Sequence, residues 1–401
     1  MKITALIQNV CLTPGRCTPG LVILVLAACS PAAATIPPAL ESLPEPTTTT
    51  SQATATVPPA TATLTHVNPE LIPFPLSEPG PYFVGRRTYA LEDSNRSNRP
   101  VGITVWYPAV LQEGSSGTIS VKDAIPDRSD APYPMILSST KVAKILAFQL
   151  VSHGFIWASV DGIDTYRQMN EQMIDQPLDI LFALDQIAAN PPDGLDGLLD
   201  TEHAGAIGYS FDGYNSLALS GARIDPEHYL AQCPNPEPTT EAILPRSLSA
   251  FDCGPPSAWD EFAAHAGEAI TASEDGMWQP MTNERIRAVI PKAGDGWWLF
   301  GERGLASVDK PTLIIVATKD ELYPENLLIF EHLGVADKTL VSFVGPGHMM
   351  VYNPEMVDRM AHFAVAFFGY HLQGRDDYAE YFSENFVAQY DDLAWGPYEG
   401  D

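Results

Sequence analysis

The chain has 401 residues, of which 50 are acidic and 22 are basic, so its formal net charge is −28 at pH 7. This charge argues against a nucleic acid as a partner, because phosphate backbones are bound by clustered cations. Hydrophobic residues make up 45% of the chain, the share of an ordinary globular protein, which excludes disorder over most of its length. No apolar run beyond the N-terminal region is long enough to span a bilayer, which excludes a multispan membrane protein.

The N-terminal residues have the pattern of a targeting segment. The apolar run over residues 21–28 is too short to cross a bilayer but suits the central region of a signal peptide. It ends in Leu-Ala-Ala-Cys29, which resembles the lipobox of bacterial lipoproteins, where the Cys takes the lipid. We therefore expect a lipoprotein signal peptide over residues 1–28, export to the bacterial cell envelope, and a membrane anchor on Cys29. The alternative is an ordinary signal peptide cleaved near Ala33 or Ala34.

A polar, proline-rich stretch follows. Residues 29–66 are rich in Ala, Thr and Pro and show no apolar period that could bury one face. Because proline interrupts helices and sheet ladders alike, we expect a semi-extended tether here. The folded domain is expected over residues 67–401.

Cysteine usage is consistent with export. Cys11 and Cys17 would leave with the signal peptide and Cys29 would carry lipid, which leaves Cys233 and Cys253. An even pair in an oxidising compartment favours a disulfide, which would contribute about 3 kcal/mol on the chain-entropy model. The alternative is two unpaired cysteines.

Beyond the tether, short strand-like runs alternate with helical patterns. Strands are expected over residues 82–91, 101–107, 135–138, 155–160, 204–209, 286–290, 312–317 and 340–344. Helices are expected over residues 142–153, 179–188, 215–221 and 325–333, and from Asn353-Pro354 onwards. This alternation predicts an α/β fold with a mostly parallel sheet and helices on both faces.

One stretch interrupts the alternation. Residues 224–284 contain many prolines, both late cysteines and only weakly amphipathic helices. We expect an insertion that forms a lid over the sheet edge and shapes substrate access. The alternative is a surface excursion without such a role.

The motif with most chemical information is Gly-Tyr-Ser210-Phe-Asp212-Gly, between a predicted strand and a predicted helix. That context is typical of a nucleophile elbow, a tight turn that exposes a serine at the N-terminus of a helix. The N–H groups there would stabilise a developing oxyanion. The usual pattern is GxSxG, whereas this chain has Asp212 at the second glycine position and Gly213 one residue later.

Two further residues complete a possible triad. Asp320 follows one late predicted strand and His348 follows the next. The chain order of serine, acid and histidine is that of the α/β-hydrolases, and loops after parallel strands converge at one sheet edge. We predict that Ser210 is the nucleophile, that His348 is the general base, and that Asp320 orients the imidazole.

Other residues near the same edge leave alternatives open. Asp295, after the predicted strand 286–290, is the alternative acid, and Glu321 is a third candidate. Trp297 and Trp298 follow Asp295, where they would either line an acyl or leaving-group pocket or pack in the core.

On these residues the chain resembles the α/β-hydrolases, specifically the bacterial branch related to platelet-activating-factor acetylhydrolase and dienelactone hydrolase. The runs Val-Gly-Ile-Thr-Val-Trp-Tyr-Pro over 101–108 and Leu-Val-Ser-His-Gly-Phe over 150–155 belong to the resemblance, which covers residues 81–386. It implies an α/β-hydrolase fold and hydrolysis of carboxylic esters through an acyl-enzyme. In the acetylhydrolases the acid of the triad can follow an earlier strand, so Asp295 stays an alternative to Asp320.

The chain departs from this family in the loop that donates one oxyanion N–H. Where the family has a Ser-His-Gly-Gly-like loop, this chain has Ser-Ser-Thr-Lys over residues 138–141 and enters a helix almost at once. By position we expect the N–H groups of Lys141 and Phe211 to form the oxyanion hole. Loss of one donor costs about 10²- to 10³-fold in turnover in subtilisin, so we expect the change to affect the rate of hydrolysis more than the type of reaction.

The sequence therefore predicts a tethered, exported esterase for small or short-acyl esters, including short-acyl phospholipids. The first alternative is a polyester (cutinase-like) or dienelactone hydrolase. The second is a non-catalytic, surface-binding lipoprotein on a decayed hydrolase fold, which Asp212 and the missing loop would suit. The sequence has no metal-binding pattern of clustered Cys and His, so neither a metal nor a cofactor is expected.

Overall fold

The computed structural model describes residues 74–111, 120–161, 170–232 and 258–400. The chain divides into two compact units, residues 1–68 and 69–401, and the described residues belong to the second. The predicted signal peptide, the tether, the lipidation site Cys29 and the predicted disulfide between Cys233 and Cys253 lie outside the described residues. These features stay predictions.

Ten strands form one sheet at the centre of the second unit. In chain order they are β1 (Phe83–Asp93), β2 (Arg99–Ala109), β3 (Val121–Lys122), β4 (Tyr133–Ser139), β5 (Ile156–Val160), β6 (Leu199–Tyr209), β7 (Ile286–Lys292), β8 (Thr312–Ala317), β9 (Lys338–Phe343) and β10 (Leu393–Trp395). Their order across the sheet is β10-β9-β8-β7-β6-β4-β5-β2-β1-β3. The strands from β9 to β5 run parallel, whereas β10, β2 and β1 pair antiparallel with their neighbours β9, β5 and β2.

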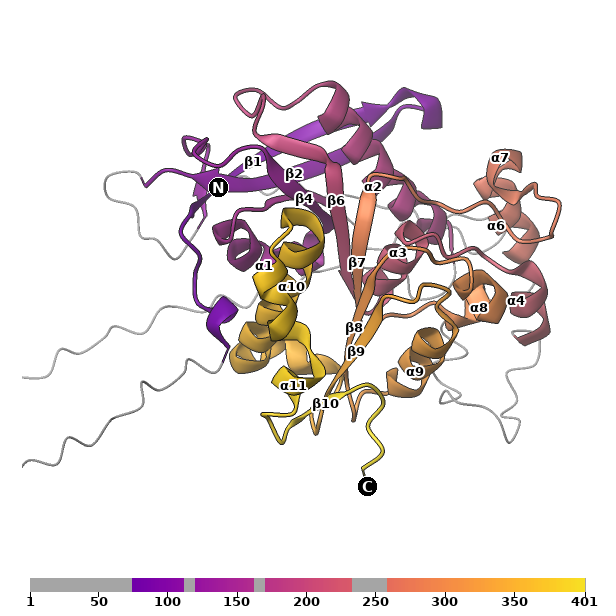
Figure 1. Ribbon diagram of the computed structural model, residues 1–401. Helices are drawn as coiled ribbons and strands as arrows, with labels where there is room; N and C mark the ends of the chain where they lie inside the picture. The colour runs from indigo at the N-terminus through magenta and orange to yellow at the C-terminus, as the bar shows by residue number, and fades with distance from the viewer. Residues whose placement is uncertain (1–73, 112–119, 162–169, 233–257, 401) are drawn as a thin grey trace, which may run out of the picture. The chain divides into compact units, whose positions relative to one another are not determined.

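Helices lie on both faces of this sheet (Figure 1). They are α1 (Thr140–Ser152), α2 (Gln172–Ala189), α3 (Phe211–Leu219), α4 (Pro226–Gln232), α6 (Trp259–Ala266), α7 (Glu268–Thr271), α8 (Trp297–Leu305), α9 (Tyr323–His332), α10 (Pro354–Gln373) and α11 (Glu384–Val387). Short 3₁₀ helices are η1 (Pro75–Ser77), η2 (Ser94–Arg96), η4 (His348–Tyr352) and η5 (Asp376–Phe382). Figure 1 shows α1 and α10 on one face and α2, α3, α8 and α9 on the other. The expected α/β architecture, a mostly parallel sheet covered on both faces, is confirmed.

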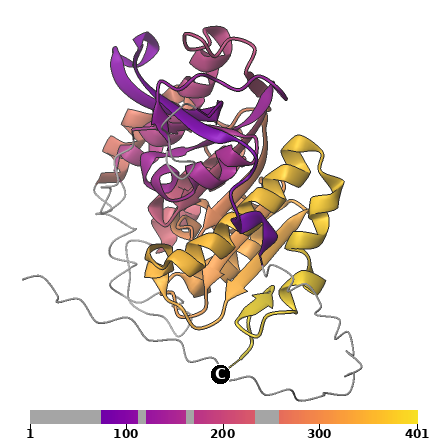
Figure 2. The same ribbon diagram turned by 90° about the vertical axis from the view of Figure 1, so that its left-hand side faces the viewer.

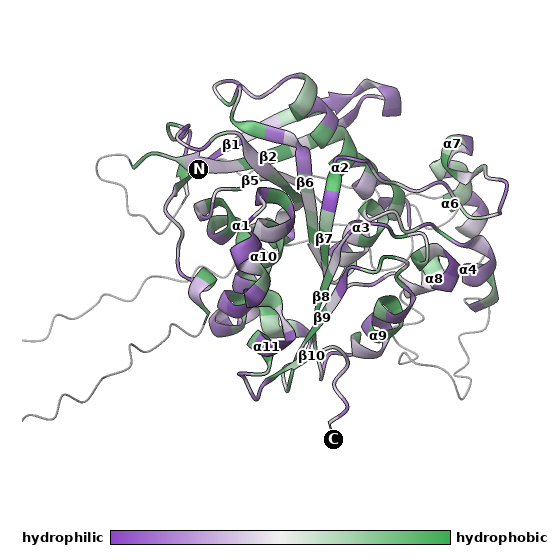
Figure 3. Cartoon of the chain, in the orientation of Figure 1, coloured by the Kyte–Doolittle hydropathy of each residue, from purple (hydrophilic) through white to green (hydrophobic). Residues whose placement is uncertain are grey.

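The burial of the strands follows from their position in the sheet. All residues of β8, the apolar run Thr-Leu-Ile-Ile-Val-Ala, are buried, because helices cover both faces of a parallel sheet. In β1, which pairs antiparallel with β2 near one edge of the sheet, some side chains are buried and others are exposed. Figure 3 shows the hydrophobic residues along the central strands, and Figure 2 shows the yellow helix α10 lying across the sheet, where it packs on β6 and β7.

The start of α10 was predicted correctly. The Asn353 side chain accepts a hydrogen bond from the N–H of Glu355, and Pro354 occupies the first turn, as expected for a capped helix start. Gly374 ends the helix in the left-handed conformation at φ 67°, which glycine adopts without strain.

Other helices begin earlier than predicted, among them α2 at Gln172 and α9 at Tyr323. Helix α1 begins at Thr140 and α3 begins at Phe211, earlier than the predicted residues 142 and 215. Apolar periodicity marks the buried face of a helix and is weak in the polar first turn, so it places the start too late. Helix α8 was not predicted, and its residue Gly301 has a non-helical backbone at φ 56°.

The described parts of the predicted insertion 224–284 form α4, α6 and α7. Aromatic contacts hold them together: the ring of Trp259 lies 4.9 Å from that of Tyr229 and 5.3 Å from that of Trp278, between centroids. An ion pair between Asp225 and Arg303, at 3.4 Å, connects this region to α8. Because residues 233–257 lie outside the described residues, the lid stays a prediction.

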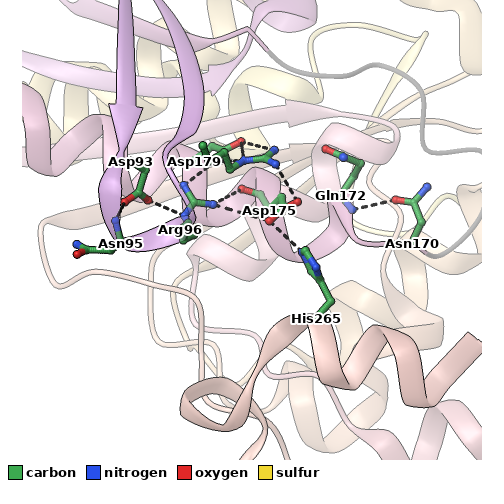
Figure 4. A network of polar contacts seen from close by, with 9 residues as sticks. Asp93, Asn95, Arg96, Asn170, Gln172, Asp175, Asp179 and His265 are labelled. Atoms are coloured by element: carbon green, nitrogen blue, oxygen red, sulfur yellow. Dashed lines mark hydrogen bonds and ion pairs between the residues drawn. The ribbon is translucent and has the colours of Figure 1, made fainter.

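A buried polar network joins the β1–β2 hairpin to α2 and α6 (Figure 4). Arg96 lies 2.6 Å from Asp179, and Arg99 lies 3.1 Å from Asp175, both on α2. His265 on α6 lies 3.1 Å from Asp175. The two carboxylates thus meet cations from the neighbouring hairpin, which offsets the cost of burying them.

The segment before β1 is anchored on α10. The N–H of Leu76 donates to Nδ1 of His362 over 3.1 Å, and the ring of Phe74 stacks on that of Tyr390 at a centroid distance of 4.5 Å. Burial lowers the pKa of His362 to about 4, so its imidazole is neutral at physiological pH and Nδ1 can accept. None of the helices in the described residues is long and apolar enough to cross a membrane.

Candidate active site

Ser210 occupies a sharp turn between β6 and α3. Its backbone has φ 59° and ψ −129°, a conformation that costs a residue with a side chain on the order of 1–3 kcal/mol. Close packing on either side explains the two glycines. A Cβ on Gly208 would lie 1.9 Å from the carbonyl oxygen of Asp212, and one on Gly213 would lie 2.5 Å from the Cα of Gly294. The turn therefore requires glycine at 208 and at 213 but permits a side chain at 212.

The three residues predicted as a triad lie in one chain of hydrogen bonds. Nε2 of His348 is 2.9 Å from Oγ of Ser210, and Nδ1 is 3.0 and 2.9 Å from the two carboxylate oxygens of Asp320. An ionised carboxylate only accepts, so Nδ1 carries the proton and Nε2 is free to accept from the serine hydroxyl. The three residues follow the parallel strands β6, β8 and β9, whose ends share one edge of the sheet.

The surroundings hold Asp320 and His348 in this orientation. The Asp320 side chain is fully buried, and that of His348 is 17% exposed. Oδ1 of Asp320 also accepts the N–H of Leu322 over 2.9 Å. A buried carboxylate with several donors is held in one orientation, and the exposed part of the imidazole leaves room for a substrate.

Sequence analysis did not identify Tyr209 as a site residue. Its ring stacks on the imidazole of His348 at a centroid distance of 5.0 Å, and its hydroxyl donates to the backbone carbonyl of His348. Burial, followed by the charge of Asp320, raises the pKa of Tyr209, so the hydroxyl stays a neutral donor. The only sequence signal is its place beside Ser210, because its partner is 139 positions away.

The alternative acid Asp295 faces a different partner. It is buried beside Glu325, which accepts the N–H groups of Gly296 and Trp297, each over 2.9 Å. Burial and the neighbouring Asp295 carboxyl raise the pKa of Glu325 well above its usual range. The structure thus places Asp320, and not Asp295, at the imidazole. Glu321, the third candidate, is exposed.

The two predicted oxyanion donors lie in the first turns of two helices. Lys141 is the second residue of α1 and Phe211 is the first residue of α3. Because β4 and β6 are neighbours in the sheet, both helices begin at the same edge. Amides in the first turn of a helix have no acceptor within that helix, so they are suited to bind a developing negative charge.

The tryptophan pair begins α8. The ring of Trp297 lies 5.3 Å from that of His228 and 5.1 Å from that of His332, between centroids. Trp297 therefore packs against α4 and α9, which favours the packing interpretation of this residue over a pocket wall.

Lys292, at the end of β7, is a second residue that the sequence analysis missed. Its side chain is fully buried, and Nζ has no hydrogen-bond partner among the described residues. Nζ lies 5.8 Å from the centroid of the Tyr209 ring. Burial lowers the pKa of Lys292 to about 7, because a low-dielectric environment disfavours the charged form.

Within the described ranges, no group of three or more His, Cys, Asp or Glu side chains is arranged to hold a metal ion. Comparison with known proteins gives no assignment: no protein-family model matches the chain, and no curated protein shows significant similarity to it.

Proposed function

We propose that the protein is a serine hydrolase that cleaves carboxylic esters, built on an α/β-hydrolase fold. The observation that carries this proposal is the hydrogen-bonded chain from Ser210 through His348 to Asp320. The strained turn at Ser210 and the positions of the three residues after parallel strands support it.

In this proposal Ser210 attacks the ester carbonyl while His348 takes its proton at Nε2. Asp320 stabilises the imidazolium that forms. The N–H groups of Lys141 and Phe211 stabilise the oxyanion of the tetrahedral intermediate. His348 then gives the proton to the leaving alcohol. In the second half, His348 takes a proton from water as the water attacks the acyl-enzyme, and returns it to Oγ of Ser210 as the carboxylic acid leaves.

The substrate class we propose is short-acyl esters, including short-acyl phospholipids, at a cell envelope where Cys29 anchors the protein. This rests on the resemblance to platelet-activating-factor acetylhydrolase and on the predicted targeting segment. A polyester hydrolase is the second candidate, and one observation favours it. Met349 and Tyr352, which follow His348, are 62% and 70% exposed, and exposed apolar side chains beside a catalytic group suit an extended apolar substrate.

Hydrolysis of p-nitrophenyl acetate, butyrate and octanoate by the full chain in detergent tests the proposal. Ser210→Ala is expected to lose on the order of 10⁶-fold in kcat, as removal of the nucleophile does in subtilisin. Ser220→Ala is the matched control, since Ser220 is buried at the other end of α3 and donates to the carbonyl of Leu217. It is expected to keep its rate.

Labelling with a fluorophosphonate gives a second measurement. The wild-type protein should be labelled and Ser210→Ala should not. Folded wild-type protein that neither hydrolyses these esters nor takes the label would overturn the proposal and favour the surface-binding lipoprotein.

A further inference from the structure

One hydrogen bond connects the first turns of α1 and α3. Oγ of Ser139 donates to Oδ2 of Asp212 over 2.7 Å, and the two residues are only 4% and 5% exposed. Ser139 is the residue before α1, and Asp212 is the second residue of α3. A serine before a helix usually caps the N–H groups of that helix. Here the hydroxyl is directed to Asp212 instead.

The other oxygen of Asp212 is also held. Oδ1 accepts from Nδ2 of Asn215 over 2.8 Å, and the same amide donates to Oε1 of Gln176 on α2 over 2.8 Å. Both oxygens of the carboxylate therefore have a donor, which fixes its plane. The bond to Ser139 is the link in this network that reaches the end of β4.

Helices α1 and α3 lie on opposite faces of the sheet (Figure 1). The Ser139–Asp212 bond joins their first turns at the ends of the neighbouring strands β4 and β6. Each of these turns carries one of the predicted oxyanion donors, the N–H of Lys141 and the N–H of Phe211. Both donors must lie about 2.7–3.1 Å from one oxygen atom, so the distance between the two helix starts has to be fixed.

We infer that Asp212 is a positioning residue: through Ser139 it sets the spacing of the two oxyanion donors in the proposed hydrolase. The inference rests on the proposed function. This positioning role would account for the glycine of the elbow motif standing at 213 and not at 212. Gly213 makes the close approach to Gly294, which leaves position 212 to carry a side chain that reaches β4. This side chain compensates for the missing glycine-rich loop.

A double-mutant cycle in the full chain tests this role. Ser139→Ala and Asp212→Ala are each expected to lower kcat for p-nitrophenyl acetate by about tenfold to hundredfold, since a misplacement of about 1 Å can cost that much. KM should stay within about twofold, because the donors act on the transition state. The double variant should lose no more than Asp212→Ala alone, because both changes remove the same bond.

Ser152→Ala is the matched control. Ser152 is a buried serine at the other end of α1, and its hydroxyl accepts from the N–H of Gly80 and donates to the carbonyl of Gln149. We expect this variant to unfold at a lower temperature with unchanged kcat. A loss in kcat as large as that of Ser139→Ala would show that any disturbance of α1 lowers the rate and would overturn the inference.

The outcomes separate the inference from the proposed function. If Ser210→Ala is inactive while Ser139→Ala keeps the wild-type kcat, or if the two losses simply add, Asp212 has no positioning role and the hydrolase proposal stands. If Ser210→Ala keeps the wild-type rate, the proposed function itself fails.

Discussion

Two neighbouring strand ends of this molecule bury carboxyl groups in opposite ways. After β8, Asp320 faces the imidazole of His348 and the N–H of Leu322. After β7, Asp295 faces a second carboxyl, that of Glu325. All of these acids are almost completely buried. The end of β7 also buries Lys292, whose amine has no hydrogen-bond partner among the described residues.

Because both acids are buried, the difference in their chemistry comes from the neighbouring side chain, an imidazole for Asp320 and a carboxyl for Asp295. Beside an imidazole, a carboxylate accepts the ring N–H and can stabilise the imidazolium that the proposed mechanism forms. Beside another carboxyl, burial and like charge favour the protonated form of one of the two groups, as the raised pKa of Glu325 shows, so the pair avoids carrying two charges. Glu325 holds the loop before α8 through the N–H groups of Gly296 and Trp297, and Asp295 faces Glu325 rather than the histidine.

The largest expected effect comes from exchanging the acids for their amides. Asp320→Asn should lower kcat on the order of 10⁴-fold, the size of the loss when the triad acid of a serine protease is changed to Asn. Asp295→Asn, the matched change at the other strand end, should lower kcat by less than about tenfold, because it does not face the imidazole. Steady-state kinetics with p-nitrophenyl acetate would measure both. A larger loss for Asp295→Asn would reverse the assignment of the acid.

A large effect on stability is expected from Lys292→Met. Burial lowers the pKa of Lys292 to about 7 in the folded protein, against 10.5 for a solvated lysine, so the unfolded chain binds more protons between these pH values. Wild-type stability should therefore rise with pH from about 7 to 10.5. The variant should gain about 5 kcal/mol at or below pH 7, at about 1.4 kcal/mol per pKa unit.

Urea unfolding at pH 6, 8 and 10 measures this gain, which should shrink towards pH 10. Lys144→Met, an exposed lysine on α1, is the control and should change stability by less than about 0.5 kcal/mol. A gain that is the same at every pH would contradict an unpaired, titrating Lys292.

A smaller effect is expected from Glu325→Gln. The amide oxygen can still accept the N–H groups of Gly296 and Trp297, and the amide nitrogen can donate to Asp295. The raised pKa of Glu325 means that the folded wild type holds a proton that the unfolded chain has lost, so its stability falls as pH rises above the usual range of a glutamate. The glutamine of the variant does not titrate, so the variant does not lose stability in this way as pH rises. Its unfolding temperature should exceed that of the wild type by a few degrees at pH 8, and the two should be equal at pH 4.

The smallest effect concerns Tyr209, whose ring lies near both strand ends, 5.0 Å from the ring of His348 and 5.8 Å from Nζ of Lys292. Tyr209→Phe keeps the stacking and removes the hydrogen bond to the His348 carbonyl. A net loss of about 1 kcal/mol would lower kcat about fivefold with little change in KM. An unchanged kcat would show that stacking alone holds the histidine.

The strands and the order of the candidate triad could be predicted because they depend on local patterns. The eight strands expected from the sequence correspond to β1, β2 and β4 to β9, since each is a run of apolar residues. Ser210, Asp320 and His348 were singled out because each directly follows such a run. The short strands β3 and β10 have only two and three residues, too few to form a pattern.

Outside the candidate triad, contacts between distant residues could not be predicted. Ser139 and Asp212 are 73 positions apart, and Gly296 and Glu325 are 29 apart. Nothing in the sequence near Asp212 indicates that its side chain reaches another strand, so its departure from GxSxG suggested a decayed site. In the structure both carboxylate oxygens of the same residue accept hydrogen bonds, from Ser139 and from Asn215.

The docking of η1 on α10 has a mechanical consequence. A pull on the chain ahead of Phe74 acts first on the stacked rings of Phe74 and Tyr390 and on the bond from Leu76 to His362. These contacts pass the load to a helix of 20 residues, before it reaches β1. Because α10 and α3 lie on opposite faces of the sheet, the turn that carries Ser210 is off the direct path of that force.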